Sequence, residues 1–316
     1  MPMQYDEGGD RGMDATTYAG FLPAPYRGTL REPESTWWQW RGRRVHIARA
    51  SRPDAPVRVM GIHGAGGHAS ALWSFASLAA DEGVEVLCPD MPLYGLTIEP
   101  RPARVRYRDW IDLLCDLVDT ERDSDPRPLI LFGASMGGMM AYEVAARTGR
   151  IAAVLATCLL DTADPEARSA AARWGLVGEA APTFLPPVAR VAGNLRLPIK
   201  WLVRMNRMSN NPDLSRLCAS DPRGGGVRVP LGFLADWFAF PHTVPEQFTA
   251  APVTLLHPAA DRWTPPQASR RFLDRISAPT RSVLLENCGH WPVEEPGLTQ
   301  LITEARSVIT AVAEPS

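Results

Sequence analysis

Short apolar runs alternate with segments of helical hydrophobic spacing along the first half of the chain. The apolar runs predict buried strands, and the helical spacing predicts amphipathic helices that cover them. The expected strands lie at residues 57–62, 84–88, 129–132 and 152–160, and the expected helices at residues 69–82, 108–119 and 136–147. Residues 37–48 precede them and predict a hairpin that turns at Arg41-Gly42. Such alternation predicts an α/β fold with a mostly parallel central sheet and helices on both faces.

The alternation stops at Asp161 and resumes at residue 253. The intervening residues, 161–251, are rich in proline, contain scattered aromatic residues and show helical patches. A connection of this length is too long for a loop in a compact domain. We therefore expect a mainly helical cap, inserted after the sixth strand, between the two parts of the core at 21–160 and 252–316.

Two segments have the composition of flexible chain. Residues 1–20 are polar and acidic, which predicts a disordered N-terminal tail. Residues 221–226 read Asp-Pro-Arg-Gly-Gly-Gly, which predicts a mobile hinge or entrance cover in the cap. After the cap, two more strands are expected at residues 253–257 and 280–286, and two more helices at residues 266–276 and 298–312.

A serine motif follows the apolar run at residues 129–132. The pentapeptide Gly133-Ala134-Ser135-Met136-Gly137, between a buried strand and a helix, is typical of a serine held in a sharp turn. Glycines leave room where the strand and helix backbones pass close to Ser135. The hydroxyl would project at the carboxyl end of the sheet, near helix N–H groups that favour negative charge. This arrangement suits a nucleophile, although the pentapeptide alone also fits an ordinary glycine-rich turn.

A nucleophilic serine needs a base and a group that orients the base. His290 lies four residues past the strand end at Glu286, and imidazole exchanges protons near neutral pH. Asp261 lies four residues past the strand end at His257, and its carboxylate could accept the imidazole N–H. Asp161 follows the preceding strand directly and could reach the same histidine. Because the loops after parallel strands converge, both aspartates remain candidates at this point.

A family resemblance adds to this reading. The three candidates occur in the chain order Ser135, Asp261, His290. With this order the sequence resembles the α/β-hydrolase superfamily, specifically its capped esterase/lipase and monoacylglycerol-lipase-like members. The resemblance covers residues 35–312 and includes two loop motifs, His-Gly-Ala-Gly-Gly at 63–67 and Asp-x-Pro-x-Tyr-Gly at 90–95.

The resemblance implies the α/β-hydrolase fold and favours Asp261 over Asp161 as the acid. It also implies an oxyanion hole built from backbone N–H groups. Its donors would be Met136, which follows the serine, and Ala65 in the first glycine-rich loop. His63 would hold that loop rather than take part in the chemistry.

Substrate contacts are expected at Gly66, Trp237 and Trp291. Gly66 is also the second choice, after Ala65, for an oxyanion donor. The aromatic side chains suggest a pocket for an apolar acyl or alcohol group, since binding clefts are mostly hydrophobic. The alternative for the aromatic residues of the cap is that they pack the cap against the core.

Composition narrows the range of partners. The formal net charge of −2 gives no reason to expect nucleic acid or an anionic membrane as a partner. No apolar run is long enough to span a membrane, and the N-terminus does not resemble a signal peptide, so we expect a cytoplasmic protein. The five cysteines are widely spaced without a C-x-x-C pair, so neither a metal nor a disulfide framework is expected. The oligomeric state stays open, with a homodimer as one option.

The predicted function is that of a serine hydrolase. It would cleave a small-molecule carboxylic ester through an acyl-enzyme, in the carboxylesterase/lipase class EC 3.1.1, without metal or organic cofactor. Two alternatives remain open from the sequence. One is another acyl or carbon–carbon bond hydrolase with the same three residues, and the other is a non-catalytic protein of this fold that binds a small ligand.

Overall fold

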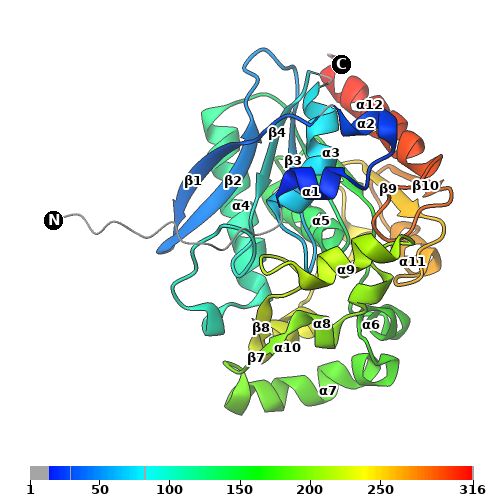
Figure 1. Cartoon of the computed structure of the whole chain (residues 1–316). Coiled ribbons are helices and arrows are strands. Elements are labelled where there is room, and N and C mark those ends of the chain that lie inside the picture. Colours follow the sequence, from blue (N-terminus) through cyan, green and yellow to red (C-terminus); the bar gives the residue numbers. More distant parts are fainter. Residues whose placement is uncertain (1–13, 29, 82, 315–316) are drawn as a thin grey trace.

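An eight-stranded sheet forms the centre of the protein (Figure 1). The computed structural model describes residues 14–28, 30–81 and 83–314. The strands are β1 (Glu34–Trp40), β2 (Arg43–Ala50), β3 (Arg58–Ile62), β4 (Glu85–Pro89), β5 (Leu129–Gly133), β6 (Ala153–Ala156), β9 (Val253–Pro258) and β10 (Thr280–Leu285). Their order is β1-β2-β4-β3-β5-β6-β9-β10, and only the β1–β2 and β2–β4 pairings within this sheet are antiparallel. The predicted mostly parallel sheet is confirmed.

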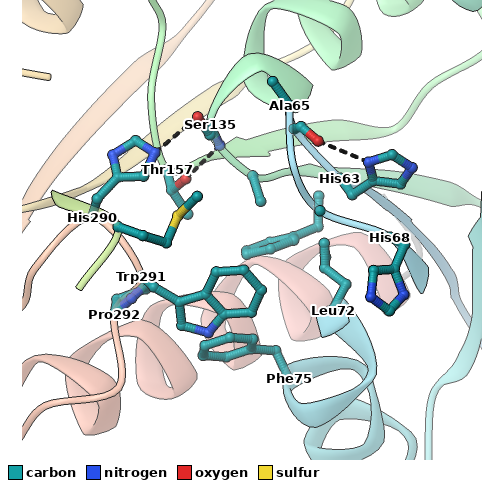
Figure 2. A pocket seen from close by; sticks show the side chains of 15 residues that line it. His63, Ala65, His68, Leu72, Phe75, Ser135, Thr157, His290, Trp291 and Pro292 are labelled. Carbon is teal, nitrogen blue, oxygen red and sulfur yellow. Dashed lines mark hydrogen bonds between the residues drawn. The ribbon is translucent and has the colours of Figure 1, made fainter. Parts of the chain in front are cut away.

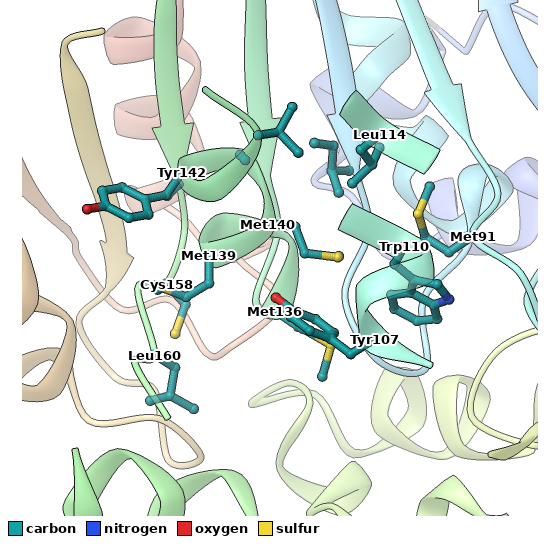
Figure 3. Close-up of a cluster of buried hydrophobic side chains, with 14 of the residues drawn as sticks. Met91, Tyr107, Trp110, Leu114, Met136, Met139, Met140, Tyr142, Cys158 and Leu160 are labelled. Atoms are coloured by element: carbon teal, nitrogen blue, oxygen red, sulfur yellow. The ribbon is translucent and has the colours of Figure 1, made fainter. Parts of the chain in front are cut away.

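Helices cover both faces of the sheet. One face carries α3 (Ala69–Asp81) and α12 (Gly297–Ala313), and the other carries α4 (Tyr107–Ser124), α5 (Met136–Thr148) and α11 (Pro266–Leu273). Each face has its own cluster of buried apolar side chains. Figure 3 shows part of the cluster under α4 and α5, where the Met140 side chain extends from α5 toward α4, which carries Trp110.

The hydrophobic spacing explains how α4 binds the sheet. Its apolar residues recur every three or four positions and are all buried: Trp110, Ile111, Leu114, Leu117 and Val118. The helix begins where the Asp109 carboxylate accepts the backbone N–H of Arg106 at 2.8 Å, which satisfies a donor at the helix end. This side-chain contact and the apolar stripe together fix the position of the helix.

The segment between β6 and β9 is mainly helical, as predicted. We call residues 161–251 the insertion, and Figure 1 shows its helices beyond the carboxyl ends of the central strands. Its elements are α6 (Pro165–Ala171), α7 (Gly175–Ala192), β7 (Arg196–Pro198), α8 (Ile199–Leu202), the 3₁₀ helix η2 (Met205–Arg207), α9 (Pro212–Ser220), β8 (Arg228–Pro230), α10 (Leu231–Ala239) and the 3₁₀ helix η3 (Pro245–Gln247). Strands β7 and β8 pair antiparallel in a small sheet of their own.

The N-terminal prediction is partly wrong. Residues 1–13 of the predicted tail lie outside the described residues, but α1 (Ala15–Ala19) and α2 (Ala24–Arg27) follow them. The physical reason is Tyr18, which is only 2% exposed. Its ring stacks on Trp291, with ring centroids 5.8 Å apart, and its hydroxyl donates a 2.6 Å hydrogen bond to Asp221. Tyr18, together with the buried Ala15, Ala19 and Leu22, therefore anchors this segment to the rest of the protein.

The contacts of residues 221–226 do not fit the predicted mobile hinge. The Asp221 side chain is fully buried and lies 2.8 Å from His68 Nε2, so this segment is anchored to the core. A second link joins Gly95 N–H to the Arg223 carbonyl at 3.0 Å. Burial opposes ionisation of Asp221, but the hydrogen bond and the charge of His68 lower the pKa of its carboxyl below the usual value. The glycines serve a tight turn around an anchored carboxylate.

Replacing Tyr18 tests whether the N-terminal helix stabilises the fold. Tyr18→Phe keeps the ring but removes a donor to a buried carboxylate, which should lower the free energy of unfolding by about 1.5–3 kcal/mol. Urea denaturation at neutral pH measures this loss. Tyr26→Phe is the matched control, because the Tyr26 hydroxyl pairs with Thr299 on the surface. It should cost less than about 0.5 kcal/mol, and equal losses in the two variants would contradict the account.

Candidate active site

Ser135 lies on the sharp turn between β5 and α5. Its backbone has φ 56° and ψ −122°, a conformation that residues with side chains rarely adopt. The turn can be this tight because Gly133 and Gly137 have no side chains. A β-carbon at Gly133 would collide with the Gly137 carbonyl, and one at Gly137 with the Ile62 carbonyl. The Ser135 N–H donates to the Thr157 hydroxyl at 3.0 Å, which fixes the strained residue from the neighbouring strand end. The predicted strand at 152–160 is shorter in the structure, where β6 spans Ala153–Ala156 and Thr157 directly follows it.

Three side chains form a continuous line of hydrogen bonds. His290, on the loop after β10, has its Nε2 2.8 Å from Ser135 Oγ (Figure 2) and its Nδ1 2.8 Å from Asp261 Oδ2. Asp261 lies on the loop after β9. Because a carboxylate only accepts, His290 Nδ1–H donates to Asp261 and leaves Nε2 free to accept the Ser135 proton. The arrangement can therefore remove a proton from the serine hydroxyl.

Asp261 is held as a carboxylate. Burial opposes its ionisation, but the charge and hydrogen bond of His290, with the Thr264 hydroxyl, lower its pKa to about 2. The backbone N–H groups of Trp263 and Thr264 donate to Oδ1 at 2.7 and 3.0 Å, and the Thr264 hydroxyl donates to Oδ2 at 2.6 Å. This carboxylate stays charged and keeps the imidazole in one orientation.

The structure places the two candidate aspartates differently. Asp161 accepts the N–H of Ala163 at 2.9 Å within its own turn. Asp261, by contrast, reaches His290, with its side chain fully buried. The geometry therefore favours Asp261 over Asp161.

Three supporting residues were missed by sequence reasoning. Thr157 binds the Ser135 N–H, and the Thr264 hydroxyl lies 3.2 Å from His290 Nδ1 as well as against Asp261. Glu294 accepts the Gly289 N–H at 3.1 Å and so holds the loop that carries the histidine. The position of Thr264, three residues after an aspartate, is a weak signal of a side-chain-capped turn. Thr157 and Glu294 carry no such local signal.

The first glycine-rich loop packs against the nucleophile. A β-carbon at Gly64 would lie 2.9 Å from Ser135 Cβ and 3.1 Å from the Met136 nitrogen, so only glycine allows this approach. His63 holds the loop from behind: its Nε2 accepts the Met91 N–H at 3.0 Å, so its Nδ1–H donates to the Gly64 carbonyl at 2.9 Å. Burial lowers the pKa of His63 to about 4, which keeps the ring neutral. The expected structural role of His63 fits these contacts.

The two predicted oxyanion donors, Ala65 and Met136, line one cavity together with the serine. Met136 is the first residue of α5, where backbone N–H groups lack intrahelical acceptors. Ala65 lies beside Ser135 at one end of a cavity (Figure 2). The two N–H groups come from different loops that the Gly64 contact holds together.

Two apolar cavities meet at Ser135 and Ala65. The first, which we call the α3 cavity, is lined by Leu72, Phe75, Phe132, Met208 and Trp291 together with the serine and histidine (Figure 2). The second, which we call the Trp237 cavity, is lined by Met139, Leu160, Val203, Trp237 and Trp263. Both cavities are lined mostly by apolar side chains, as small-molecule binding sites usually are.

Two of the three predicted substrate residues line a cavity beside Ser135, and the third does not. Trp291 lines the α3 cavity and Trp237 lines the cavity named after it. Gly66 lines neither of these two cavities, because Met205 of the insertion covers it: a β-carbon there would lie 2.7 Å from Met205 Cε. Two other aromatic residues of the insertion, Trp174 and Trp201, are more than half exposed and line neither of these two cavities.

Neither a metal cluster nor a membrane-spanning helix is found in the described part of the chain. Its His, Cys, Asp and Glu side chains form no group of three or more that could hold a metal ion. Among the helices of the described residues (14–28, 30–81 and 83–314), none is long and apolar enough to cross a bilayer.

Cys158 has the buried thiol that lies nearest the site. Burial raises the pKa of this thiol to about 12, so it stays protonated beside Thr264.

The ionisation of Asp261 predicts a pH-dependent contribution to stability. Its pKa is about 2 in the folded protein and 3.8 ordinarily, so folding favours the charged form. The stabilisation, on the order of 2 kcal/mol, is present above about pH 4 and is lost as the pH falls toward 2. Urea denaturation of wild type and Asp261→Asn should show a large difference at pH 7 that shrinks at pH 3. Asp161→Asn is the matched control, and a difference for Asp261→Asn that does not change with pH would contradict the prediction.

Comparison with known proteins places the chain in a family. No curated protein sequence matches it significantly. Its fold is similar to a monoglyceride lipase from Saccharomyces cerevisiae, with a TM-score of 0.75, 15% identity, and coverage of 93% of this chain and 100% of that one. It is also similar to a monoacylglycerol lipase from Paleococcus ferrophilus (TM-score 0.64, 21% identity, coverage 85% and 98%) and a carboxyl esterase from Bacillus coagulans (TM-score 0.70, 14% identity, coverage 90% and 100%). A sequence profile described as "Alpha/beta hydrolase family" matches residues 59–299, most of the chain. The chain therefore belongs to the alpha/beta hydrolase family.

Proposed function

We propose that the protein is a serine hydrolase that cleaves a carboxylic ester through an acyl-enzyme, in the EC 3.1.1 class. The observation that carries the proposal is the line of hydrogen bonds from Ser135 through His290 to Asp261, with both distances at 2.8 Å. A serine whose proton can pass to an oriented imidazole is an activated nucleophile. The lipase and esterase neighbours support the same chemistry by analogy of fold.

The mechanism has two halves. His290 Nε2 takes the hydroxyl proton while Ser135 Oγ attacks the acyl carbon, and the backbone N–H groups of Ala65 and Met136 receive the negative carbonyl oxygen. The intermediate collapses, the ester C–O bond breaks, and His290 returns the proton to the departing alkoxide. Water then attacks the acyl-enzyme with His290 again as base, which releases the acid and restores Ser135. Asp261 stabilises the imidazolium in both halves.

The two cavities favour an ester with apolar groups. Their linings are mostly aliphatic and aromatic side chains that would exclude water from the reacting carbonyl. One cavity can hold the acyl group and the other the alcohol, because they meet at the serine. The monoglyceride lipase among the structural neighbours was solved with a substrate analogue, which is consistent with an ester of this kind.

We propose that the insertion acts as a cap over this site. Met208 and Val203 of the insertion line the α3 and Trp237 cavities respectively, and Trp237 comes from α10. The backbone N–H of Trp291 also donates to the Met208 carbonyl at 2.7 Å, directly beside the catalytic histidine candidate. The insertion therefore closes both cavities from the carboxyl side of the sheet.

The proposal is tested by measuring the hydrolysis of p-nitrophenyl acetate by wild type and by variants of Ser135, Asp261 and Asp161, with Asp161 as the matched control for Asp261. Ser135→Ala should abolish turnover, and Asp261→Asn should lower kcat by about 10⁴, because the imidazole loses its orienting acceptor. Asp161→Asn should leave kcat within about twofold, since its carboxylate bonds within its own turn.

Two outcomes would overturn the proposal. Unchanged turnover in Ser135→Ala would exclude this serine as the nucleophile. A folded wild type that turns over no ester, yet binds a small apolar ligand, would favour the non-catalytic alternative.

A further inference from the structure

The α3 cavity does not end at the active site. At its far end from Ser135, Phe75 and Trp291 lie side by side next to α12 (Figure 2). Leu72, Phe75 and Phe132, which close this end, also form the wall of another cavity between α3 and α12. A single layer of side chains therefore separates the two spaces.

The space between α3 and α12 continues to the surface. Its lining is wholly apolar and includes Ala76 and Ala79 of α3 with Leu301, Ala305 and Ile309 of α12. An outer cavity shares Phe75, Ala79 and Ala305 with it and ends beside Arg306 and Thr310. We call this series of cavities, from Phe75 to Thr310, the α3–α12 channel.

Small residues and loose helix packing explain why the channel exists. Alanines face it from both helices, at positions 76, 79 and 305. Helix α12 fully buries only Gly297, Leu298 and Leu301, and its later apolar residues, up to Ile309 and Val312, are only partly buried against the core. Phe132 of the central strand β5 is only partly buried, and its side chain lines both the α3 cavity and the channel. An apolar space within a core costs stability unless something fills it.

We propose that the α3–α12 channel receives the linear alkyl chain of the ester, which makes the substrate a long-chain ester. This inference rests on the proposed esterase function for its reacting group. From Leu301 to Ile309 the channel follows α12 for about 12 Å, at 1.5 Å per residue. With no charged side chain among the residues of its inner part, it suits hydrocarbon and no polar group.

Phe75 is the specificity-determining residue in this arrangement. Its side chain lines the α3 cavity, the inner part of the channel and the outer cavity. Rotation of this ring would join the spaces, so short chains end at Phe75 and long chains pass it. The alkyl chain can belong to the acyl group or to the alcohol, since either part of the ester can lie on this side of Ser135.

Chain-length series on wild type and plugged variants test the proposal. With p-nitrophenyl esters from acetyl to palmitoyl, each methylene that enters the channel should raise kcat/KM roughly fourfold until the channel is full. Ala305→Trp fills the channel and should lower kcat/KM for the dodecanoyl ester roughly tenfold or more while leaving acetate within about twofold. Ala311→Trp is the matched control, because Ala311 is an exposed alanine of the same helix, and it should follow wild type. A parallel series of alkyl acetates shows whether the alcohol chain responds instead.

A second variant keeps the test independent of a destabilised helix. Phe75→Ala removes the wall between the spaces, so it should shift the optimum to longer chains instead of lowering all rates. The proposal is overturned if Ala305→Trp and Ala311→Trp respond alike to chain length in both series. It is also overturned if Ala171→Trp, at a residue that lines the Trp237 cavity, removes the long-chain preference instead.

Binding of dansyl-undecanoic acid separates this proposal from the esterase function. Fluorescence of the probe should report binding to wild type, Ser135→Ala and Ala311→Trp, and weaker binding to Ala305→Trp. If no ester is turned over but this binding pattern is observed, the function fails and the channel stands. If acetate is turned over but Ala305→Trp binds the probe like wild type, the channel fails and the function stands.

Discussion

The close approach of three backbones at Ser135 is the constraint on which the site depends. The end of β3, the start of α5 and the glycine-rich loop after β3 meet where Gly64 and Gly137 have no side chains. This contact forces the positive φ of Ser135 and brings the loop that carries Ala65 beside the N-terminus of α5. The strain at the serine is sustained because the surrounding strands and the Thr157 hydroxyl determine its position.

Buried carboxylates organise the surroundings of that turn. Asp261 fixes His290, and its own charge is maintained by hydrogen bonds that outweigh the cost of burial. Asp221 has a comparable structural role at the other side of the α3 cavity, where it joins His68 of the core, Tyr18 of α1 and the insertion. Both are buried acids with several donors, which is the condition under which a buried charge is tolerated. The core, the N-terminal helix and the insertion are thereby held in one arrangement around the cavities.

The sequence predicted the strand–helix order and the positions of Ser135 and His290, because those signals are local: an apolar run, a glycine-flanked turn and a short loop. It could not decide between Asp261 and Asp161 from the residues alone, since both follow strands of one sheet edge. It missed the role of Tyr18, whose partner Asp221 is 203 residues away, and so predicted disorder and a hinge where the structure has a buried contact. The α3–α12 channel likewise depends on how two distant helices pack, which no local pattern records.

Covalent labelling tests the central claim, that Ser135 is an activated nucleophile, most directly. Wild type and Ser135→Ala would be treated with a fluorophosphonate at neutral pH, and the modified peptide mapped by mass spectrometry. A single label on Ser135, absent from Ser135→Ala and strongly slowed in Asp261→Asn, is the predicted result. A label on another residue, or an unlabelled wild type that still hydrolyses esters, would contradict the account.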